Sequence, residues 1–599
     1  MRRNLLLLLC SAFVLSMNAK VVYVTSTGSA GNDGSSWDKA VDNLTTAMTK
    51  VTAGDEIWMA KGTYVIGQTL TLADYVDIYG GFAGTETSID QRVREDESKP
   101  WSFVNETILT GSGDYRLTDV SKGFDRTEVA YFDGLTVSGH ATANDKICYF
   151  NNNYIIQNCR CINNKIGGKG FYVEENSIVR DCYFAGNSAF NESKQDGACA
   201  LQGRECGKAS AVANQILNCV FEKNSIQSLS IYSTATKAGD TYAAQTTKVS
   251  GCVFRNNTYI CLNVKSEWPA SAEGTYTADR KVVVSDNLFE NNVSEVNVIT
   301  CYADASADFV RNIVRNNSVT CDPAGSNWKV SVLYLTKKFR VANCLLANNS
   351  STALLMYQGG ATWIGNSTFA NNVGSIYVEA GGYSELGNSI VLGNTATHQG
   401  KDIFCTDADE LNYVEFVAID GDNDDVTGDC ITTTAAETFK KPTSFVGVAT
   451  DDAQRAELAA ADYSLKAGSA CVGAGQHDFE AMAMTNDWVE VNLQTDLAGN
   501  NFVKESGKVN MGAYQGDLNT GVSRVAAENS CQVWVNGNTL TVKGASDGAA
   551  MTVYTVAGTV VANVALQGGN DEITLQNGLY LVRIVTASGI ETAKVLINE

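Results

Sequence analysis

Proline and histidine are the scarcest components of this sequence: its 599 residues include four Pro and only three His, at His140, His398 and His477. Scarce proline suits a protein built from in-register strands with tight corners, because proline cannot donate to a strand ladder. None of the three histidines lies in a recognisable catalytic motif. The Cys-x-x-Cys pair is also missing, which disfavours a zinc site.

Positive charge is the next shortage. The chain has 44 Lys and Arg against 66 Asp and Glu, which gives a net charge of −22. An acidic surface disfavours nucleic acid and anionic membranes as partners, and it favours solubility and divalent cations. No stretch outside the N-terminus is apolar for long enough to cross a bilayer, so the sequence predicts no transmembrane span. We expect a monomer.

What the sequence does contain is a recurring phrase, Asn-Cys-x-Phe-x-x-Asn. Its copies follow one another at irregular spacing, which is typical of stacked coils with loops of varying length between them. The shortest spacings match the bare coil of a parallel solenoid, and the longer ones leave room for surface loops after the closing Asn. Clear copies begin at Asp181, Asn218, Gly251 and Asp286, and looser ones at Asn158, Arg311, Asn343, Asn366 and Asn388.

Each copy has an internal grammar that specifies the path of the backbone. The Cys and the Phe are two residues apart and share one face of a strand, whereas an apolar residue three places before the Cys needs a bend to point inward as well. The residue before the Cys is mostly Asn, Asp or Gly, the types that tolerate left-handed backbone at a turn. Stacking such coils predicts a right-handed parallel β-helix with a ladder spacing of about 4.8 Å.

On these motifs the chain resembles the pectin-lyase-like superfamily of right-handed β-helix proteins over residues 20–516. The Phe-x-x-Asn phrase is also similar to the repeats of bacterial polymorphic outer-membrane adhesins. The resemblance implies an all-β solenoid with a cap and first coil at 20–100, a β-helix with loop insertions at 101–415, and closing coils and a cap at 416–516. It says little about activity, because one fold hosts many functions.

The N-terminus has the pattern of a secretion signal. Arg2 and Arg3 precede an apolar stretch too short to span a membrane, and Ala19 fits a cleavage site, so residues 1–19 are predicted to be a signal peptide. Cys10 is the alternative, as a lipid-attachment cysteine, but the residues just before it are all Leu and its apolar core would be very short.

Residues 517–530 form a polar linker, and residues 531–599 alternate as short strands that predict a small C-terminal β-sandwich. The phrase Gly578–Arg583 followed by Lys594–Ile597 resembles the sorting domain of type IX secretion substrates of Bacteroidota. The resemblance implies export by outer-membrane secretion machinery, with the protein secreted or held on the outer-membrane surface. An ordinary terminal sandwich is the alternative. The predicted strands are Gln532–Val535, Thr539–Lys543, Met551–Thr555, Leu579–Val585 and Thr592–Ile597.

Seventeen cysteines in an exported chain normally suggest disulfides. Here several occupy one inward position of the coil, where buried thiols fill a narrow core. Neighbouring rungs bring their Cα atoms to a bridgeable distance, but parallel side-chain directions fit disulfide torsions poorly. We therefore favour free thiols over disulfides at Cys159, Cys182, Cys219, Cys252 and Cys344.

A search for the catalytic residues that the β-helix resemblance would imply finds no assembled set. The polygalacturonase combination of Asn-Thr-Asp, Asp-Asp, Gly-His-Gly and Arg-x-Lys is missing, as is the Arg-x-Pro-x-x-Arg of pectate lyases. Arg255 and Arg315 could serve as bases, but with Glu222 and Glu290 they alternate in charge on successive rungs, which predicts a structural ladder. Distant coils can still assemble a site that one sequence does not reveal, so catalytic residues stay unassigned.

The densest acidic run of the chain is a candidate cation site. Carboxylates at alternating positions on a Gly-containing loop suit Ca²⁺, which takes about six to eight oxygen ligands. The run lacks the Glu that closes an EF-hand loop, and a solvated acidic loop is the alternative. The predicted ligands are Asp420, Asp422, Asp424 and Asp425.

Aromatic and basic residues gather in four insertions, at 188–215, 225–248, 258–283 and 318–340. Aromatic faces stack on sugar rings, and basic groups pair with the carboxylates or sulfates of sugars. Because all four insertions follow the closing Asn, we expect their loops to line one corner as a groove for an anionic polysaccharide. Packing of the loops on one another is the alternative. The candidate ligand-binding residues are Tyr232, Tyr259, Trp268, Tyr276, Arg280, Lys281, Trp328, Lys337 and Lys338.

Together these features predict an exported cell-surface or secreted β-helix protein that binds a glycan, a host surface or a neighbouring cell. A polysaccharide lyase or glycoside hydrolase acting on an anionic polysaccharide is the alternative, and a passive surface-layer stalk is the third. Whether the chain is an enzyme stays open, and the missing catalytic motif places binding first.

Overall fold

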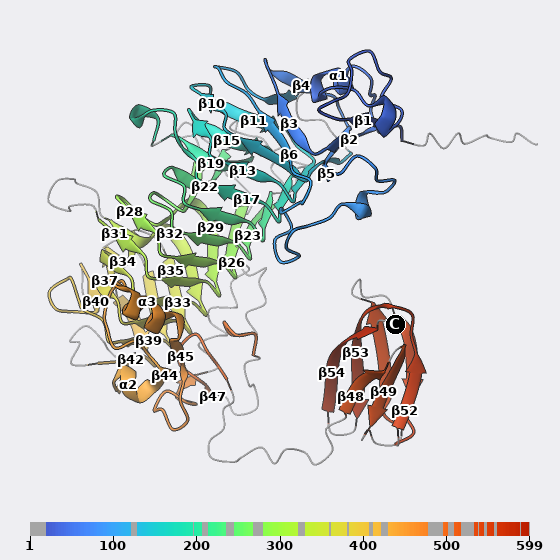
Figure 1. Cartoon of the computed structure of the whole chain (residues 1–599). Helices are drawn as coiled ribbons and strands as arrows, with labels where there is room; N and C mark the ends of the chain where they lie inside the picture. Colours follow the sequence, from blue (N-terminus) through green and yellow to red (C-terminus); the bar gives the residue numbers. More distant parts are fainter. Residues whose placement is uncertain are drawn as a thin grey trace, which may run out of the picture. The chain divides into compact units, whose positions relative to one another are not determined.

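The computed structural model divides the chain into two compact units, Met1–Leu518 and Asn519–Glu599, and the larger one is the long stack of strands in Figure 1. No helix in the described part of the chain is long and apolar enough to cross a membrane. The structure describes residues 19–120, 128–195, 197–205, 214–234, 245–267, 280–320, 330–358, 361–379, 383–406, 411–420, 429–476, 495–500 and 508–516 of the first unit, and 532–536, 538–543, 545, 548–555, 560–568, 570–586 and 589–597 of the second.

The larger unit is a right-handed parallel β-helix, as the repeat predicts. Its strands pair in parallel with those one coil before and one coil after, and parallel crossovers of this kind are almost always right-handed. Each coil passes through three faces, which we call the entry sheet, the short sheet and the exit sheet. The short sheet owes its name to strands of mostly three residues.

The strands of each sheet follow one another from the N-terminus to the C-terminus. The entry sheet contains β1 (Val21–Val24), β2 (Glu56–Ala60), β5 (Asp77–Phe82), β8 (Ala130–Asp133), β12 (Tyr154–Gln157), β16 (Ile178–Arg180), β20 (Gln215–Leu217), β23 (Gln245–Ser250), β26 (Arg280–Ser285), β35 (Ala361–Gly365), β38 (Tyr383–Gly387) and β41 (Leu411–Glu415). The exit sheet contains β4 (Leu70–Leu72), β7 (Thr118–Val120), β11 (Lys146–Phe150), β15 (Lys169–Val173), β19 (Cys199–Glu205), β22 (Gln227–Thr234), β25 (Leu262–Glu267), β34 (Ser350–Gln358), β37 (Val373–Glu379) and β40 (Ile403–Cys405).

Two long strands join the entry and exit sheets. Strands β29 (Ile299–Val310) and β32 (Ser331–Ala342) each run through both, so the two sheets form one 26-stranded hydrogen-bonded sheet. The 14-stranded short sheet contains β3 (Gly62–Val65), β6 (Thr107–Thr110), β9 (Leu135–Ser138), β13 (Arg160–Ile162), β17 (Tyr183–Ala185), β21 (Val220–Glu222), β24 (Val253–Arg255), β27 (Leu288–Glu290), β30 (Ile313–Arg315), β33 (Leu345–Ala347), β36 (Thr368–Ala370), β39 (Ile390–Leu392), β42 (Ala418–Ile419) and β43 (Ile431–Thr432).

The remaining elements of this unit are short. Five two-residue strands lie at coil corners: β10 (Ala141–Thr142), β14 (Lys165–Ile166), β18 (Ser188–Ala189), β28 (Val293–Ser294) and β31 (Ser318–Val319). Antiparallel pairs close the C-terminal end: β44 (Phe439–Lys441) with β45 (Asp462–Leu465), and β46 (Gly475–Gln476) with β47 (Lys508–Val509). The helices are η1 (Trp37–Lys39), α1 (Leu44–Met48), η2 (Ile89–Gln91), η3 (Glu192–Lys194), α2 (Ala435–Thr438) and α3 (Asp452–Ala459).

Left-handed residues form both corners of the short sheet. The residue before the Cys position is left-handed in all nine copies of the phrase, with φ between 47° and 69°. Even Arg311 adopts φ 51°, where a bulky residue is uncommon. The repeat predicts a second corner at the closing Asn, but the left-handed residue is the one before it, as at Lys223 and Asn256. The closing Asn is therefore buried rather than exposed at the turn.

The closing asparagines form a ladder inside the solenoid. Each side-chain Nδ2 donates to the Oδ1 of the next Asn over 2.8–3.1 Å. Each Oδ1 also accepts from the backbone N–H of the ladder Asn one coil before. Each Nδ2 also donates to a backbone carbonyl, as Asn257 does to Phe221. Every polar atom is thus satisfied without water. The ladder consists of Asn164, Asn187, Asn224, Asn257, Asn292, Asn317, Asn349, Asn372 and Asn394.

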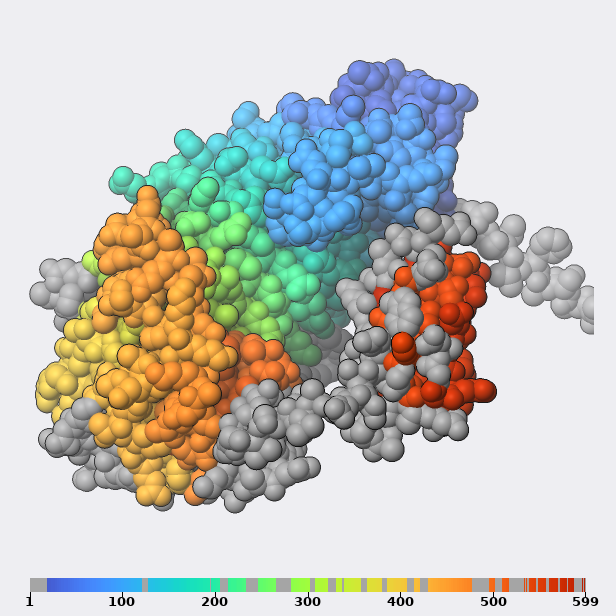
Figure 2. Space-filling view, turned by 60° about the horizontal axis from the view of Figure 1, so that its bottom comes forward, coloured from blue at the N-terminus to red at the C-terminus, as the bar shows by residue number. Residues whose placement is uncertain are grey.

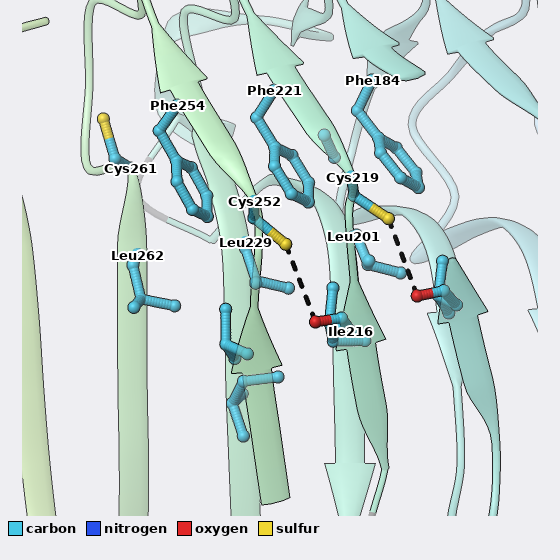
Figure 3. Packing of buried hydrophobic residues seen from close by; sticks show 14 of the residues in the cluster. Phe184, Leu201, Ile216, Cys219, Phe221, Leu229, Cys252, Phe254, Cys261 and Leu262 are labelled. Atoms are coloured by element: carbon cyan, nitrogen blue, oxygen red, sulfur yellow. Dashed lines mark hydrogen bonds between the residues drawn. The ribbon is translucent and has the colours of Figure 1, made fainter. Parts of the chain in front are cut away.

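Beside the ladder, phenylalanines and cysteines fill the core in register. The rings of Phe221 and Phe254 stack with centroids 4.7 Å apart and an interplanar angle of 4°. The Cys219 and Cys252 thiols point to backbone carbonyls of the preceding coil at 3.6 Å (Figure 3). The described cysteines are free thiols, as predicted, and burial raises the pKa of Cys344 to about 12.

Apolar side chains cover the N-terminal end of the solenoid and one side of its C-terminal coils. At the N-terminus, α1 contributes Leu44 and Ala47 to the main core, and its first turn is capped by the Asn43 side chain. At the C-terminus, Phe439, Tyr463 and Met511 pack on the outer face of the short sheet. Figure 2 shows this C-terminal segment in orange against the yellow and green coils.

The smaller unit contains two antiparallel sheets around one apolar cluster. One sheet has the order β48-β49-β52 and the other β51-β50-β53-β54. Leu540, Met551 and Val582 are buried in the cluster. The sequence missed β51 and β52, which lie in stretches with weak alternation. The strands are β48 (Gln532–Asn536), β49 (Thr539–Lys543), β50 (Ala550–Thr555), β51 (Val560–Ala565), β52 (Asn570–Thr574), β53 (Gly578–Thr586) and β54 (Gly589–Ile597).

Replacing one ladder asparagine should destabilise the solenoid strongly. Asn257→Ala removes the acceptor of two Asn224 donors and the donor to Asn292 and to the Phe221 carbonyl. Each buried polar group left unpaired costs about 1–3 kcal/mol, so we expect a loss of about 3 kcal/mol or more. The urea midpoint of unfolding measures it, with the exposed neighbour Thr258→Ala as control. Equal midpoints for the two variants would show that the ladder does not stabilise the fold.

Candidate functional site

Only two of the nine predicted ligand-binding residues, Tyr232 and Tyr259, have side chains that the structure describes. Tyr232 faces outward on β22, with the Lys265 Nζ 5.9 Å from its ring centroid, while Tyr259 is only 7% exposed. Arg280 and Lys281 lie on β26, and Lys337 and Lys338 on β32, but their side chains are not described. Trp268, Tyr276 and Trp328 are outside the described residues altogether.

The predicted single corner for all four insertions is wrong. Each insertion contains an exit-sheet strand, which the sequence analysis counted as loop: β19, β22, β25 and the start of β32. In the first three coils, the residues that the structure does not describe come after that strand in the sequence, at 206–213, 235–244 and 268–279. In the fourth coil, 321–329 precedes it. A groove shared by Trp268 and Trp328 therefore loses its geometric basis.

The outer face of the exit sheet carries the polar and aromatic side chains that the prediction sought elsewhere. Leu201, Leu229 and Leu262 point into the core (Figure 3), so the residues beside them on each strand face outward. Register aligns these residues in one outward row, which we call the exit row. It runs through Tyr149, Tyr172, Gln202, Ser230, Asn263 and Thr300.

At its N-terminal end the exit row becomes a dense cluster of rings and charges. The Tyr149 and Tyr172 rings meet edge to face with centroids 5.4 Å apart. The Lys146 Nζ lies 4.5 Å from the Tyr172 centroid, and the Arg116 guanidinium lies 5.6 Å from that of Tyr149. Arg204 donates to the Tyr172 hydroxyl at 3.0 Å. We call these five residues together with Glu174 the Tyr149 cluster.

Glu174 is the buried acid of this cluster. It is 3% exposed, and the Tyr149 hydroxyl donates a hydrogen bond to its carboxylate. Burial raises the pKa of Glu174, although the hydrogen bond from Tyr149 and the nearby Arg204 oppose the shift. Burial and the Glu174 charge also raise the pKa of Tyr149. Perturbed acids beside rings and cations are typical of functional sites.

Sequence analysis missed the Tyr149 cluster, although one signal was available. Lys146 and Tyr149 are three residues apart, and so are Lys169 and Tyr172 on the next coil. This repeated Lys-x-x-Tyr lies outside the Asn-Cys-x-Phe-x-x-Asn phrase. The number of residues between the closing Asn and the exit-sheet strand varies from coil to coil, so residues of these strands have no fixed distance from the phrase.

The charge row of the short sheet is structural, as predicted. Glu222, Arg255, Glu290 and Arg315 follow one another in register. Arg255 pairs with Glu222 at 3.2 Å and Arg315 with Glu290 at 2.8 Å. These pairs explain both arginines without a catalytic role.

Two carboxylates meet at the C-terminal coils near the predicted cation site. Asp420 is exposed, and its Oδ2 accepts from the Gly393 N–H at 2.6 Å. Burial and the charge of Asp420 raise the pKa of Asp402 to about 7. Among the described residues, no group of three or more His, Cys, Asp or Glu is arranged to hold a metal. Asp422, Asp424 and Asp425 lie outside the described residues, so calcium stays a prediction.

Reversing one charge of the short-sheet row should have a small, salt-sensitive effect. Glu290→Lys places three cations side by side, at Arg255, position 290 and Arg315. Exposed ion pairs contribute about 0.2–1 kcal/mol to stability. Salt screens the repulsion between the three cations that the substitution creates. Thermal melting at low and high salt measures this. A large loss of stability that salt leaves unchanged would mean that the row is not an exposed ladder.

Neutralising Asp402 should make stability less dependent on pH. The folded-state pKa of Asp402, about 7, lies above its usual value, so the folded chain binds the extra proton between about pH 4 and 7. Its contribution to stability is complete below that window and is lost as the pH rises through it. Asp402→Asn should therefore melt higher than the wild type at pH 8 and equally at pH 4. The exposed Asp429→Asn is the control. An identical pH dependence for Asp402→Asn and the wild type would refute the assignment.

Comparison with known proteins finds likeness only among solved structures. No family model and no curated protein matches the chain. Pectate lyase Pel9A aligns at 12% identity over 84% of this chain and 98% of its own, with a TM-score of 0.34. XylC in complex with xylose gives 10% identity, 83% and 98% coverage, and a TM-score of 0.37. The tailspike gp49 of Acinetobacter baumannii bacteriophage Fri1, a capsular polysaccharide depolymerase, aligns at 13% identity over 96% of this chain and 80% of its own, with a TM-score of 0.30. Likeness this low carries no argument about activity.

Proposed function

We propose that this chain is an exported protein that binds an anionic polysaccharide on the outer face of its exit sheet. The observation that carries the proposal is the set of cations placed against aromatic rings on that face. Lys146 lies over Tyr172, Arg116 over Tyr149, and Lys265 over Tyr232. Rings present flat apolar area to sugars, and cations pair with sugar carboxylates or sulfates.

Because the whole chain is acidic, the few clustered cations determine where a polyanion can bind. With a net charge of −22, the protein repels polyanions over most of its surface. A polyanion can then bind only where several basic groups are close together, and the Tyr149 cluster supplies Arg116, Lys146 and Arg204. Two of these cations are ion-paired in the structure, Arg116 with Asp119 at 2.7 Å and Lys146 with Asp145 at 2.5 Å, so an acidic glycan would share them with these carboxylates.

Export is the other half of the proposal. The predicted signal peptide at 1–19 and the resemblance of 531–599 to a type IX sorting domain support passage through the periplasm to the outer-membrane surface or beyond. The compact second unit, which holds its own apolar cluster, is compatible with a separately recognised address. The outer-membrane secretion machinery would then be its partner.

Processing of the bound polysaccharide is the second candidate function. Glu174 favours it, because an acid that has a raised pKa and a hydrogen bond from a tyrosine is a candidate for proton transfer. A lyase would leave an unsaturated uronate, and a hydrolase a new reducing end. Formation of either product from a bound polymer would turn the binding protein into an enzyme.

Removing two cations of the Tyr149 cluster should weaken binding. In a glycan array, the double variant Arg116→Ala and Lys146→Ala should lose about tenfold or more in affinity for acidic glycans, and added salt should narrow the difference. Lys440→Ala, an exposed lysine far along the chain, is the matched control. Uronate absorbance and reducing ends are read in the same samples. If the wild type gave neither binding nor product, the passive stalk would replace this proposal.

A further inference from the structure

The middle of the exit row is polar on four successive rungs. Here Gln202, Asn263 and Thr300 are half-buried, and Ser230 is 6% exposed, so polar groups occupy four successive rungs. Asn263 donates to Gln227 at 3.1 Å, and Gln202 to Ser230 at 3.4 Å. These bonds hold the amides in place along the row.

The short sheet shows that this polarity is not general to the solenoid. Its outward row at the same coils reads Val220, Val253 and Leu288. The two faces are built on the same coils and share one core, so the difference lies in the side chains selected for each surface. At these coils the exit row offers amide and hydroxyl groups, whereas the short sheet offers an aliphatic row beside the ion-paired row of Glu222, Arg255 and Glu290.

A second outward row runs parallel to the exit row, two residues further along each strand. It places Arg204 on β19, Tyr232 on β22 and Lys265 on β25, in direct register. Neighbouring rungs are about 4.8 Å apart, so the two cations are separated by about 10 Å. On the preceding coil, the residue directly after β15 is the acidic Glu174. Positive charge therefore recurs on alternate rungs rather than on every rung.

We propose that a linear polysaccharide lies lengthwise on the exit row, one sugar unit per rung, with an acidic group on every second sugar. This inference rests on the proposed function and specifies its ligand. A pyranose unit in an extended chain has nearly the length of one rung, so successive sugars meet successive amides or hydroxyls of the row. Amide side chains donate and accept at once, which suits paired sugar hydroxyls. Arg204 and Lys265 then meet alternate acidic groups, and Tyr232 meets the neutral sugar between them.

The exit row also limits the length of oligosaccharide that it can contact. From Tyr149 on β11 to Thr300 on β29 it spans six rungs, and beyond Thr300 it continues into Tyr334 and Met356, which pack in an apolar cluster. A chain of six sugars would cover the polar part. Longer chains would add few contacts.

The test is calorimetric titration of the full chain with size-defined hyaluronan oligosaccharides, which carry one carboxylate per disaccharide. Affinity should rise about tenfold or more from disaccharide to hexasaccharide and change little in longer chains. Oligogalacturonates, with a carboxylate on every sugar, should bind more weakly at equal length, because the additional carboxylates meet the acidic Glu174 or share the Lys265 cation at Tyr232 and gain no cation of their own. Asn263→Ala and Gln202→Ala should each weaken hexasaccharide binding about threefold to tenfold and disaccharide binding little.

Gln215→Ala on the entry sheet is the matched control and should bind as the wild type does. Asn263 and Gln202 are half-buried, so each variant is first checked for an unchanged melting temperature. One correctly folded variant of the two is enough for the binding test. Equal affinity for disaccharide and hexasaccharide would overturn the lengthwise arrangement and leave the proposed function standing. Tighter binding of oligogalacturonate would overturn the alternating charge. If no acidic glycan bound at all, the proposed function would fail with it.

Discussion

A ladder of buried asparagines is the constraint on which the rest of this structure depends. Each side chain has two donors and an acceptor, and the partners are the same atoms one coil away. A slip of one residue in any coil would leave several of these groups unpaired in a dry core, at a cost larger than surface contacts can offset. The left-handed residue before each asparagine turns it inward, so backbone conformation and polar pairing enforce the same register.

Fixed register turns a one-dimensional repeat into rows of side chains. Inside, it stacks Phe184, Phe221, Phe254 and Phe289 with centroids 4.6–5.0 Å apart. Outside, the same geometry gives each face its own row, apolar and ion-paired on the short sheet, amide-rich and cationic on the exit sheet. A polymeric ligand whose repeat matches the spacing of the rungs contacts equivalent positions of one row on successive coils. A rigid scaffold gains specificity for such a ligand from this match.

The sequence predicts the part of the fold that repeats and misses the part that varies. Corner residues such as Asn218 and Gly251, the inward Cys position and the parallel stacking all follow from one phrase of fixed spacing. The exit-sheet strands have no fixed distance from that phrase, so β19, β22 and β25 were counted as loop and the insertions were assigned to one corner. The Tyr149 cluster was missed for the same reason. The pKa of Glu174 is raised first by burial and then by the charge of Glu175, and composition does not reveal burial.

The central claim is that register on the exit sheet builds a lengthwise binding row for an acidic polymer. A crystal structure of the full chain with a hyaluronan hexasaccharide tests it most directly. The account predicts sugar density along the solenoid axis from β11 to β29, with carboxylates beside Arg204 and Lys265 and a neutral sugar at Tyr232. Sugar lying across the rungs, or bound at the short sheet beside Val253 and Leu288, would contradict it.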